Sequence, residues 1–472
     1  MISKWLYSKR VRTVAFITCL FFIITYSSLF NNVYLDQFKQ SPINYHIPST
    51  AHSSDINMRI YTPHLNTLRD QLTRTFPYDP ESLIPHTIWQ TWKNGPQDSK
   101  FPSKFRSTQK KWTSMAQATG YQYSLITDES ILPLLQNLYG EVPLVIEAYN
   151  LLPTIILKAD FFRYLILYAR GGIYSDMDTH PLKPFNEWVS SSESTLYKQL
   201  YSGTLLPYKN VNRDSTKLPS HEPGLIIGIE ADPDREDWAK WYARRMQFCQ
   251  WTIQSKPGHP LLRELILNIT ATTLKSVQGS PYSDDQNEMF DLKHLRDYDI
   301  NYRYSSSRNS SNYDYTQKKN RKNVDGTDIM NWTGPGIFTD ITFEYLSNII
   351  RTNNDIPLLN SDLQKPLNDE IINEQSKSIK RFYNIISEQL LTYARIPWEF
   401  FAFLQNPAMV DDVMILPITS FSPGVGQMEA KGTDDKLAFV EHLFSGSWKE
   451  DADKNSNKNS NKNNGGIPPV PE

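Results

Sequence analysis

The chain has 472 residues, 39% of them hydrophobic and 12% aromatic, which is enough to bury the core of one large or two ordinary domains. Its formal charge of −2 provides no basic excess, so we expect no nucleic-acid partner. The two cysteines, Cys19 and Cys249, exclude an intrachain disulfide framework and a cysteine-based metal site.

The N-terminus has the basic and then apolar pattern of a membrane anchor. Lysines and arginines up to position 12 precede an uncharged run from Val14 to Phe30. As a helix, these 17 residues span about 25 Å, close to the roughly 27 Å of thin early secretory membranes. A cleaved signal peptide is the alternative, but the run is longer than a typical signal core and the cleavage site is poor. We predict a cytosolic tail over 1–12 and a single-pass type II anchor over 13–33.

The segment after the anchor is predicted to be a lumenal stem. Residues 34–82 are polar and contain several prolines, and only a weak helix is expected within them, over 65–75. Glycosylation sequons at Asn268, Asn309 and Asn331 agree with a lumenal body.

Strands and helices alternate from residue 83 onward. The apolar, β-branched and aromatic residues 83–92 predict a first strand, and Gly120 ends a predicted helix over 101–119. The other predicted strands cover 121–126, 173–175, 195–206, 224–229 and 413–416. The other predicted helices cover 130–139, 144–151, 158–170, 235–254, 260–275 and 340–351. This alternation predicts an α/β domain with a largely parallel sheet over residues 83–448.

Three segments do not fit this alternation. Residues 297–326 are rich in Tyr, Ser, Asn, Lys and Arg and are predicted to form a mobile insertion. Residues 353–380 are a second loop candidate. The low-complexity tail, 449–472, is predicted to be disordered.

The stretch from Lys158 to Phe185 carries the clearest chemical signal. Its apolar helix is stopped by Gly171 and Gly172, and a short strand then leads to Asp176 and Asp178. Because strand side chains alternate, both carboxylates can face the same side, with their origins roughly 6 to 7 Å apart.

Two carboxylates in this arrangement suit a hard divalent cation, Mn²⁺ or Mg²⁺, that keeps open positions for a diphosphate. They do not suit the acid and nucleophile of a glycoside hydrolase, because those two carboxylates flank a bond. A solvated turn is the alternative, since Asp-x-Asp is a common tripeptide. Asp160 and Arg163 share one face of the preceding helix, where they form either a structural ion pair or a ligand site.

Six motifs occur in a characteristic order: IPHTIWQTW, KADFFRYLILYARGGIYSDMDTHPLKP, GIEADPD, QFCQWTIQSKPGHP, WTGPG and HLFSGSW. In this order they resemble glycosyltransferase family 32, and more narrowly its fungal Golgi α-1,6-mannosyltransferases. The resemblance covers roughly residues 83–448 and leaves out the stem, the insertion and the tail.

This resemblance implies a GT-A fold with a Rossmann-like mixed sheet, GDP-mannose as donor, Mn²⁺ as cofactor with Mg²⁺ as the substitute, and retention of anomeric configuration. By matching position, Asp176, Asp178 and His442 hold the metal, while Asp160 and Arg163 grip the donor sugar. The remaining donor contacts implied are Trp89 against the nucleotide base, Tyr174, and Trp448 near the leaving phosphates. A lone histidine and a core tryptophan are each equally well explained as structural residues.

The implied activity is transfer of mannose to a mannose of N-linked glycans by a Golgi membrane enzyme with a lumenal catalytic domain. It corresponds either to initiation of the outer chain or to synthesis of the mannan backbone with other mannosyltransferase subunits. A catalytically silent scaffold of such a complex is one alternative, and a sphingolipid mannosyltransferase is the other.

Overall fold

The structure is a computed structural model that describes residues 67–191, 194–201, 223–232, 238, 242–276, 329–352, 358–360, 390 and 392–445. The predicted anchor, the 297–326 insertion and the tail lie outside these residues. Of the helices in the described ranges, none combines the length and the apolar character needed to cross a membrane. The described residues all belong to one unit, which begins at Met58.

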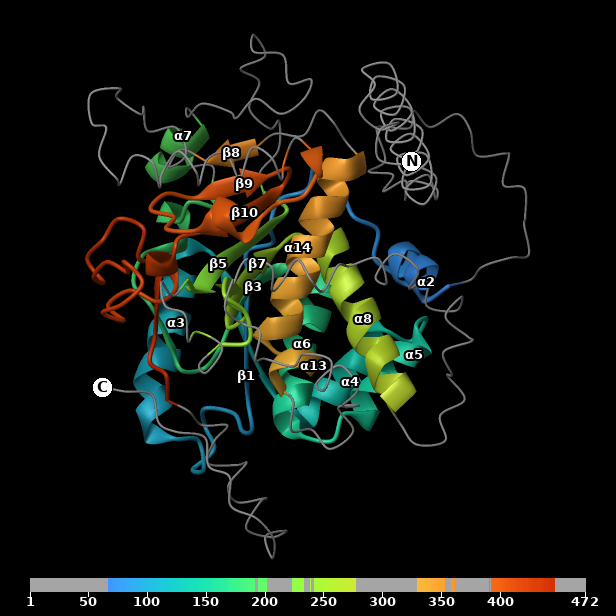
Figure 1. Cartoon of the computed structure of the whole chain (residues 1–472). Coiled ribbons are helices and arrows are strands. Elements are labelled where there is room, and N and C mark those ends of the chain that lie inside the picture. The colour runs from blue at the N-terminus through green and yellow to red at the C-terminus, as the bar shows by residue number, and fades with distance from the viewer. Residues whose placement is uncertain are drawn as a thin grey trace, which may run out of the picture. The chain divides into compact units, whose positions relative to one another are not determined.

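A mixed β-sheet forms the centre of this unit, with the strand order β2-β1-β3-β7-β5-β10-β9-β8 (Figure 1). Its strands are β1 (Thr87–Trp92), β2 (Gln122–Thr127), β3 (Gly172–Ser175), β5 (Leu225–Ala231), β7 (Thr252–Ser255), β8 (Leu358–Asn360), β9 (Ala408–Val410) and β10 (Val413–Leu416). β1 is parallel to β2 and β3, and β10 is parallel to β5. β7 joins the two parallel groups and is antiparallel to both β3 and β5. The α/β class is confirmed, but the sheet is mixed with a parallel core and not largely parallel.

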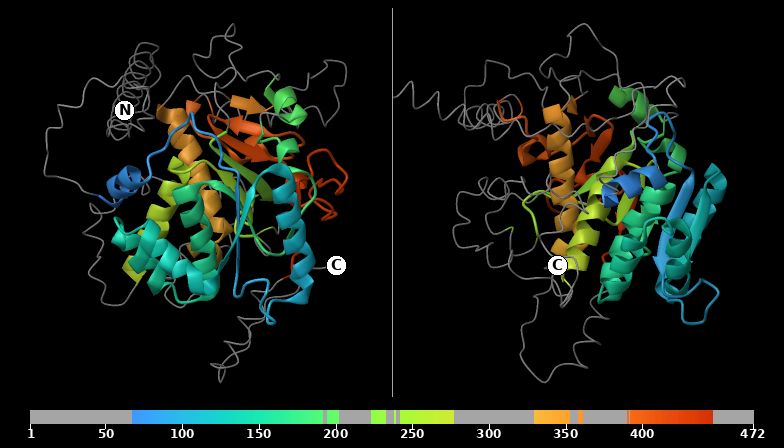
Figure 2. Two further views of the ribbon diagram at one scale, coloured as in Figure 1. Left: turned by 180° about the vertical axis from the view of Figure 1, so that it is seen from behind. Right: turned by 90° about the vertical axis from the view of Figure 1, so that its right-hand side faces the viewer.

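Helices cover both faces of the sheet. They are α3 (Ser103–Thr119), α4 (Asp128–Leu138), α5 (Pro143–Leu151), α6 (Ile155–Arg170), α7 (Thr195–Tyr201), α8 (Pro260–Ser276), α13 (Ile329–Trp332) and α14 (Pro335–Thr352). Figures 1 and 2 show α6, α8 and α14 side by side on one face and α3 on the other. A separate ribbon of β4 (Thr179–Pro181) and β11 (Val440–His442) lies beyond the main sheet.

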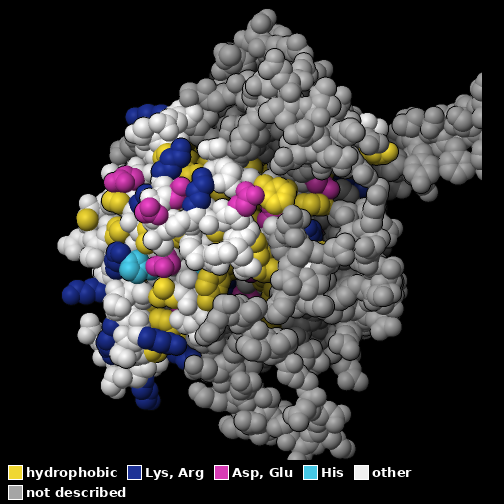
Figure 3. All heavy atoms as spheres, turned by 60° about the vertical axis from the view of Figure 1, so that its left-hand side comes forward, with side chains coloured by type: hydrophobic (Ala, Val, Ile, Leu, Met, Phe, Trp, Pro, Cys, Tyr) yellow, Lys and Arg dark blue, Asp and Glu magenta, His cyan; other side chains and the backbone are white. Residues whose placement is uncertain are grey.

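Alternation along the strands explains this layering. In β1 and β3, Ile88 and Ile173 pack into the core that contains Trp112 of α3, while Tyr174 packs into the core of α6 and α8. Each strand therefore has an apolar residue for each face, which is why both faces can be covered. The face seen in Figure 3 carries interspersed basic and acidic side chains.

Two predicted elements were wrong. The strand predicted over 195–206 begins as helix α7, because the Ser194 hydroxyl accepts a hydrogen bond from the Leu196 amide at 3.1 Å and caps the helix. The helix predicted over 235–254 contains instead the strands β6 (Gln247–Phe248) and β7. Thr252–Ser255 are buried on both faces between two strands, so they form a strand and not the end of a helix.

Part of the predicted stem packs on the body. Helix α2 (Leu68–Thr75) buries Leu68 and Leu72 completely, and Arg69 pairs with Glu264 of α8 at 2.6 Å. Thr67 caps it in a capping box with Asp70. Residues 67–75, within the predicted stem, therefore pack on the same unit as the residues after 83.

Candidate active site

Two glycines fix how α6 passes into β3. Gly171 and Gly172 have φ angles of 63° and 97°, a region that other residues rarely adopt. A Cβ atom on Gly171 would lie 2.7 Å from the Ser255 carbonyl oxygen, and one on Gly172 would clash with the Thr87 carbonyl oxygen. The predicted helix stop is confirmed, and the close approach of β1 and β7 explains why both positions need glycine.

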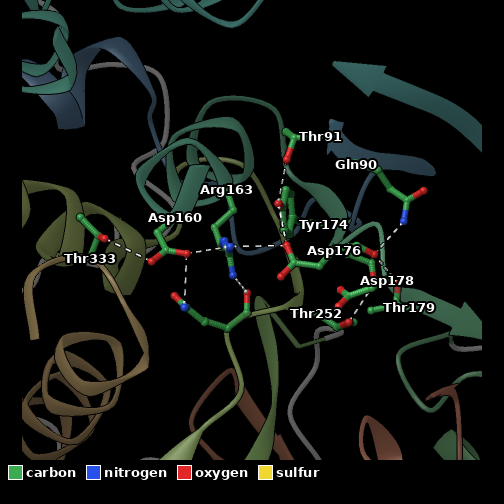
Figure 4. A network of polar contacts seen from close by, with 12 residues as sticks. Gln90, Thr91, Asp160, Arg163, Tyr174, Asp176, Asp178, Thr179, Thr252 and Thr333 are labelled. Carbon is green, nitrogen blue, oxygen red and sulfur yellow. Dashed lines mark hydrogen bonds and ion pairs between the residues drawn. The ribbon is translucent and has the colours of Figure 1, made fainter. Parts of the chain in front are cut away.

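Asp160 and Arg163 form a buried ion pair on α6. Arg163 Nη2 lies 2.7 Å from Asp160 Oδ1 and 3.4 Å from Asp176 Oδ1 (Figure 4). Arg163 Nη1 also donates to the Gln250 carbonyl oxygen at 3.1 Å, and the guanidinium lies over the Tyr174 ring. The Arg163 guanidinium thus connects α6 to Asp176, the first carboxylate of the Asp-x-Asp sequence.

The Asp160 carboxylate also accepts hydrogen bonds from two other segments. Gln250 Nε2 donates to Oδ1 at 3.3 Å, and the Thr333 hydroxyl donates to Oδ2 at 3.2 Å. The Tyr164 hydroxyl contacts both Gln250 Oε1 and the Thr333 carbonyl oxygen. Burial raises the pKa of Asp160 to about 6, and the Arg163 guanidinium opposes that rise.

Asp176 follows directly after β3. The Tyr174 hydroxyl donates to its Oδ1 at 2.8 Å, and Gln90 of β1 donates to its backbone oxygen at 2.9 Å. Its side chain is nevertheless 27% exposed, so one part of the carboxylate remains accessible. Burial raises the pKa of Asp176, against the influence of Arg163.

Asp178 contacts His442 and Ser445, at the C-terminal end of the described residues. Because β11 pairs with β4, His442 lies opposite Thr179, and His442 Nε2 comes 3.4 Å from Asp178 Oδ1. The Ser445 amide donates to Asp178 Oδ2 at 3.1 Å. Although burial acts in the other direction, the hydrogen bond and charge of His442 hold the pKa of Asp178 below its ordinary value.

Asp176, Asp178 and His442 can each direct one ligand atom to a common point, with all three atoms within 4.8 Å of one another. Two carboxylates and an imidazole are a donor set that suits Mn²⁺. The rings of Trp251 and Phe444 lie 4.5 and 4.3 Å from that of His442 and fix its position. The residues present therefore fit the divalent cation that the sequence predicts.

The other two predicted contacts are less central. Trp89 donates a hydrogen bond from its indole nitrogen to the Gly171 carbonyl oxygen at 2.8 Å and is partly buried against the core. It therefore supports the turn at Gly171 between α6 and β3. Its contact with a nucleotide base stays a prediction. Trp448 lies outside the described residues.

Sequence reasoning missed the residues that surround Asp160. Gln250 lies in QFCQW and Thr333 in WTGPG, two motifs that carried the family resemblance without being given a role. Their placement in those motifs was the signal that could have identified them. Gln90, in the first strand motif, was missed in the same way.

The sequence is similar to that of known proteins. Residues 102–195 match the family described as "Glycosyltransferase sugar-binding region containing DXD motif". The chain is 52% identical to an initiation-specific α-1,6-mannosyltransferase of Saccharomyces cerevisiae, over 96% of this chain and 98% of that protein. A protein of the same description from Candida albicans is 40% identical, over 90% of this chain and 88% of that protein. Another from Schizosaccharomyces pombe is 33% identical, over 82% of this chain and 69% of that protein.

Proposed function

The chain belongs to the family of fungal initiation-specific α-1,6-mannosyltransferases, and from that premise we propose that it transfers mannose from GDP-mannose to a 6-hydroxyl of a core N-linked glycan. The observation that carries this proposal is the junction of the Asp160–Arg163 pair with the Asp176, Asp178 and His442 cluster. A sugar site and a cation site that share Asp176 suit a nucleotide sugar, whose diphosphate lies next to its sugar.

When bound, Mn²⁺ held by Asp176, Asp178 and His442 would neutralise negative charge on the diphosphate as the C1–oxygen bond breaks. Arg163 brings a second, permanent positive charge close to the same carboxylate. Asp160 has two carboxylate oxygens directed by neighbours and can accept hydrogen bonds from sugar hydroxyls. Trp89, Tyr174 and Trp448 are proposed to complete the nucleotide contacts.

We further propose that the configuration at C1 is retained by attack on the same face from which GDP leaves. In such a reaction the leaving phosphate oxygen takes the proton of the acceptor hydroxyl. The chain's part is then to position donor and acceptor and to exclude water. The lumenal Golgi location and the single N-terminal anchor belong to the same proposal.

The direct test uses the unit that begins at Met58, without the predicted anchor. It is incubated with GDP-mannose and Mn²⁺ and offered, in separate reactions, a core N-glycan and an α-1,6-linked mannose oligomer. We expect an α-1,6-mannosyl product on the core glycan. Product on the oligomer alone would identify a backbone-elongating enzyme, and absence of any GDP release would support the silent scaffold.

A further inference from the structure

Glu230 lies at the end of β5, in the motif GIEADPD, and the Asp160 network described above does not use it. In the pairing of β5 with β6, Ile229 lies opposite Phe248 and Ala231 lies opposite Gln247. Between these two pairs, β5 contains one residue that has no partner on β6. This extra residue is Glu230, which makes the irregularity a β-bulge. Bulges beside functional sites commonly redirect a side chain that regular pairing would point elsewhere.

The Glu230 carboxyl group is left without a full set of partners. Its Oε2 is buried and has no hydrogen-bond partner among the described residues. The neighbouring Gln247 accepts the Ala243 amide with its Oε1 at 3.0 Å, but its buried Nε2 has no partner in the described part of the chain either. A buried acceptor and a buried donor that both remain open cost stability, unless a ligand satisfies them.

The position of Glu230 connects it to the Asp160–Arg163 pair. The Cys249 amide donates to the Gly228 carbonyl oxygen at 2.8 Å, so β5 runs beside the segment that continues into Gln250. Gln250 in turn contacts both Asp160 and Arg163. The end of β5 and the ion pair therefore contact the same short segment.

Electrostatics agrees with this placement. Burial raises the pKa of Glu230 to about 8, while the Gln247 amide and the Arg163 charge oppose the rise and Asp160 adds to it. Both charges of the ion pair are thus near enough to act on Glu230. At neutral pH the group is mostly a carboxylic acid, which can donate one hydrogen bond and accept others.

We propose that Glu230 is a further residue of the donor site and that it binds a hydroxyl group of the sugar being transferred, together with Asp160. This inference rests on the proposed function for the identity of that sugar. The open Oε2 of Glu230 and the open Nε2 of Gln247 supply the acceptor and donor that a sugar hydroxyl needs. In a purely structural role Glu230 would only receive a hydrogen bond from the neighbouring Gln247 side chain, and its replacement would not distinguish GDP-mannose from GDP.

The test compares how substitutions of Glu230 affect GDP-mannose, which carries the sugar, and GDP, which does not. Glu230→Ala removes the contact, whereas Glu230→Gln keeps the shape and the neutral hydrogen-bonding group. We expect Glu230→Ala to lower kcat/KM for GDP-mannose by ~10- to 100-fold and to leave the inhibition constant of GDP unchanged within ~2-fold. Glu230→Gln should retain kcat/KM within ~5-fold of the unsubstituted chain.

Glu399 provides a matched control, since burial also raises its pKa, to about 6, and the Arg245 charge opposes that rise. Glu399→Ala should change neither GDP-mannose nor GDP affinity. Where Glu230→Ala does not fold, Glu230→Met fills a similar volume without hydrogen bonds and should show the same selective loss for GDP-mannose.

Three results would overturn the inference: equal loss of GDP and GDP-mannose binding, no loss of either in the alanine and methionine variants, or an inactive Glu230→Gln that still binds GDP-mannose normally. The last result would identify a reactive carboxylate in place of a binding group. Failure of the proposed function is distinguishable, because the unsubstituted chain would then not prefer GDP-mannose or release GDP.

Discussion

Asp160 and Arg163 lie three residues apart on one helix and expose 2% and 4% of their side chains, whereas Asp178 and His442 come from a turn and a distant strand and expose 14% and 11%. The first pair is held by α6, Gln250 and Thr333. The second depends on the short β4–β11 ribbon and on the amides of Leu443 and Ser445. The proposed sugar-binding half is thus built into the core, and the proposed cation-binding half is completed by residues 440–445.

This difference implies different responses to substitution. Loss of a buried partner leaves a charge uncompensated, so it should cost both stability and activity. Loss of a partly exposed ligand should affect cation binding and activity while the fold persists.

The largest effect is expected at Asp178. Asp178→Ala removes one of two carboxylates from the cation cluster, and we expect no measurable mannose transfer, with thermal unfolding unchanged within a few degrees. Asp176→Ala should also abolish transfer, but it should cost stability as well, because Asp176 is one of the two carboxylates beside the buried Arg163. Transfer assays and circular dichroism check this, and activity that survives both substitutions would exclude the cluster as the reaction site.

A loss in both activity and stability is expected at Asp160. Asp160→Asn leaves the buried Arg163 without one of its two carboxylates, which should destabilise the fold by about 3 kcal/mol and lower kcat/KM by at least ~10-fold. Denaturant unfolding and transfer rates measure the two effects.

Asp340→Asn is the matched control, because Asp340 forms another buried pair, with Arg244. It should destabilise the fold to a comparable extent and leave kcat/KM unchanged. If Asp160→Asn lost stability alone, the pair on α6 would be structural and not a sugar site.

His442 should affect cation affinity more than turnover. His442→Ala removes one ligand of three, so the Mn²⁺ concentration for half-maximal activity should rise by ~10- to 100-fold, with activity largely recovered at saturating Mn²⁺. His180→Ala, on the neighbouring strand β4 but outside the cluster, should leave the Mn²⁺ dependence unchanged. An unaltered Mn²⁺ titration for His442→Ala would show that the histidine only supports Asp178.

The last prediction concerns the pH dependence of stability and not activity. The pKa of Glu230 is raised from 4.5 to about 8, so the native state binds a proton more tightly than the unfolded chain does. Its stabilising contribution is present below pH 4.5 and is lost as pH rises through about 8. Glu230→Gln cannot lose this proton, so the unfolding free energy of the unsubstituted chain should fall relative to Glu230→Gln between pH 5 and pH 8. Parallel stability profiles of the two proteins would show that folding does not raise the pKa of Glu230.

The sequence identified the local half of the site well. Helix α6, the glycine stop, β3 and the two aspartates are contiguous, so periodicity and turn chemistry were sufficient to place them. The link from Asp178 to His442 spans more than half the chain and came only from the family resemblance.

Gln250 and Glu230 could not be found from local patterns, for a physical reason. Both depend on pairing among β5, β6 and β7, and the segment containing β6 and β7 was predicted to be a helix. A bulge is defined by the partner strand, which a single segment of sequence does not contain.

The most direct measurement is a calorimetric titration of GDP-mannose into the unit that begins at Met58, with and without Mn²⁺, for the unsubstituted chain and for Asp178→Ala. If Asp176, Asp178 and His442 hold a cation that binds the donor diphosphate, GDP-mannose binds the unsubstituted chain at least ~10-fold more tightly with Mn²⁺, and Asp178→Ala loses this gain. Equal affinity with and without Mn²⁺, or an undiminished gain in Asp178→Ala, would contradict the account.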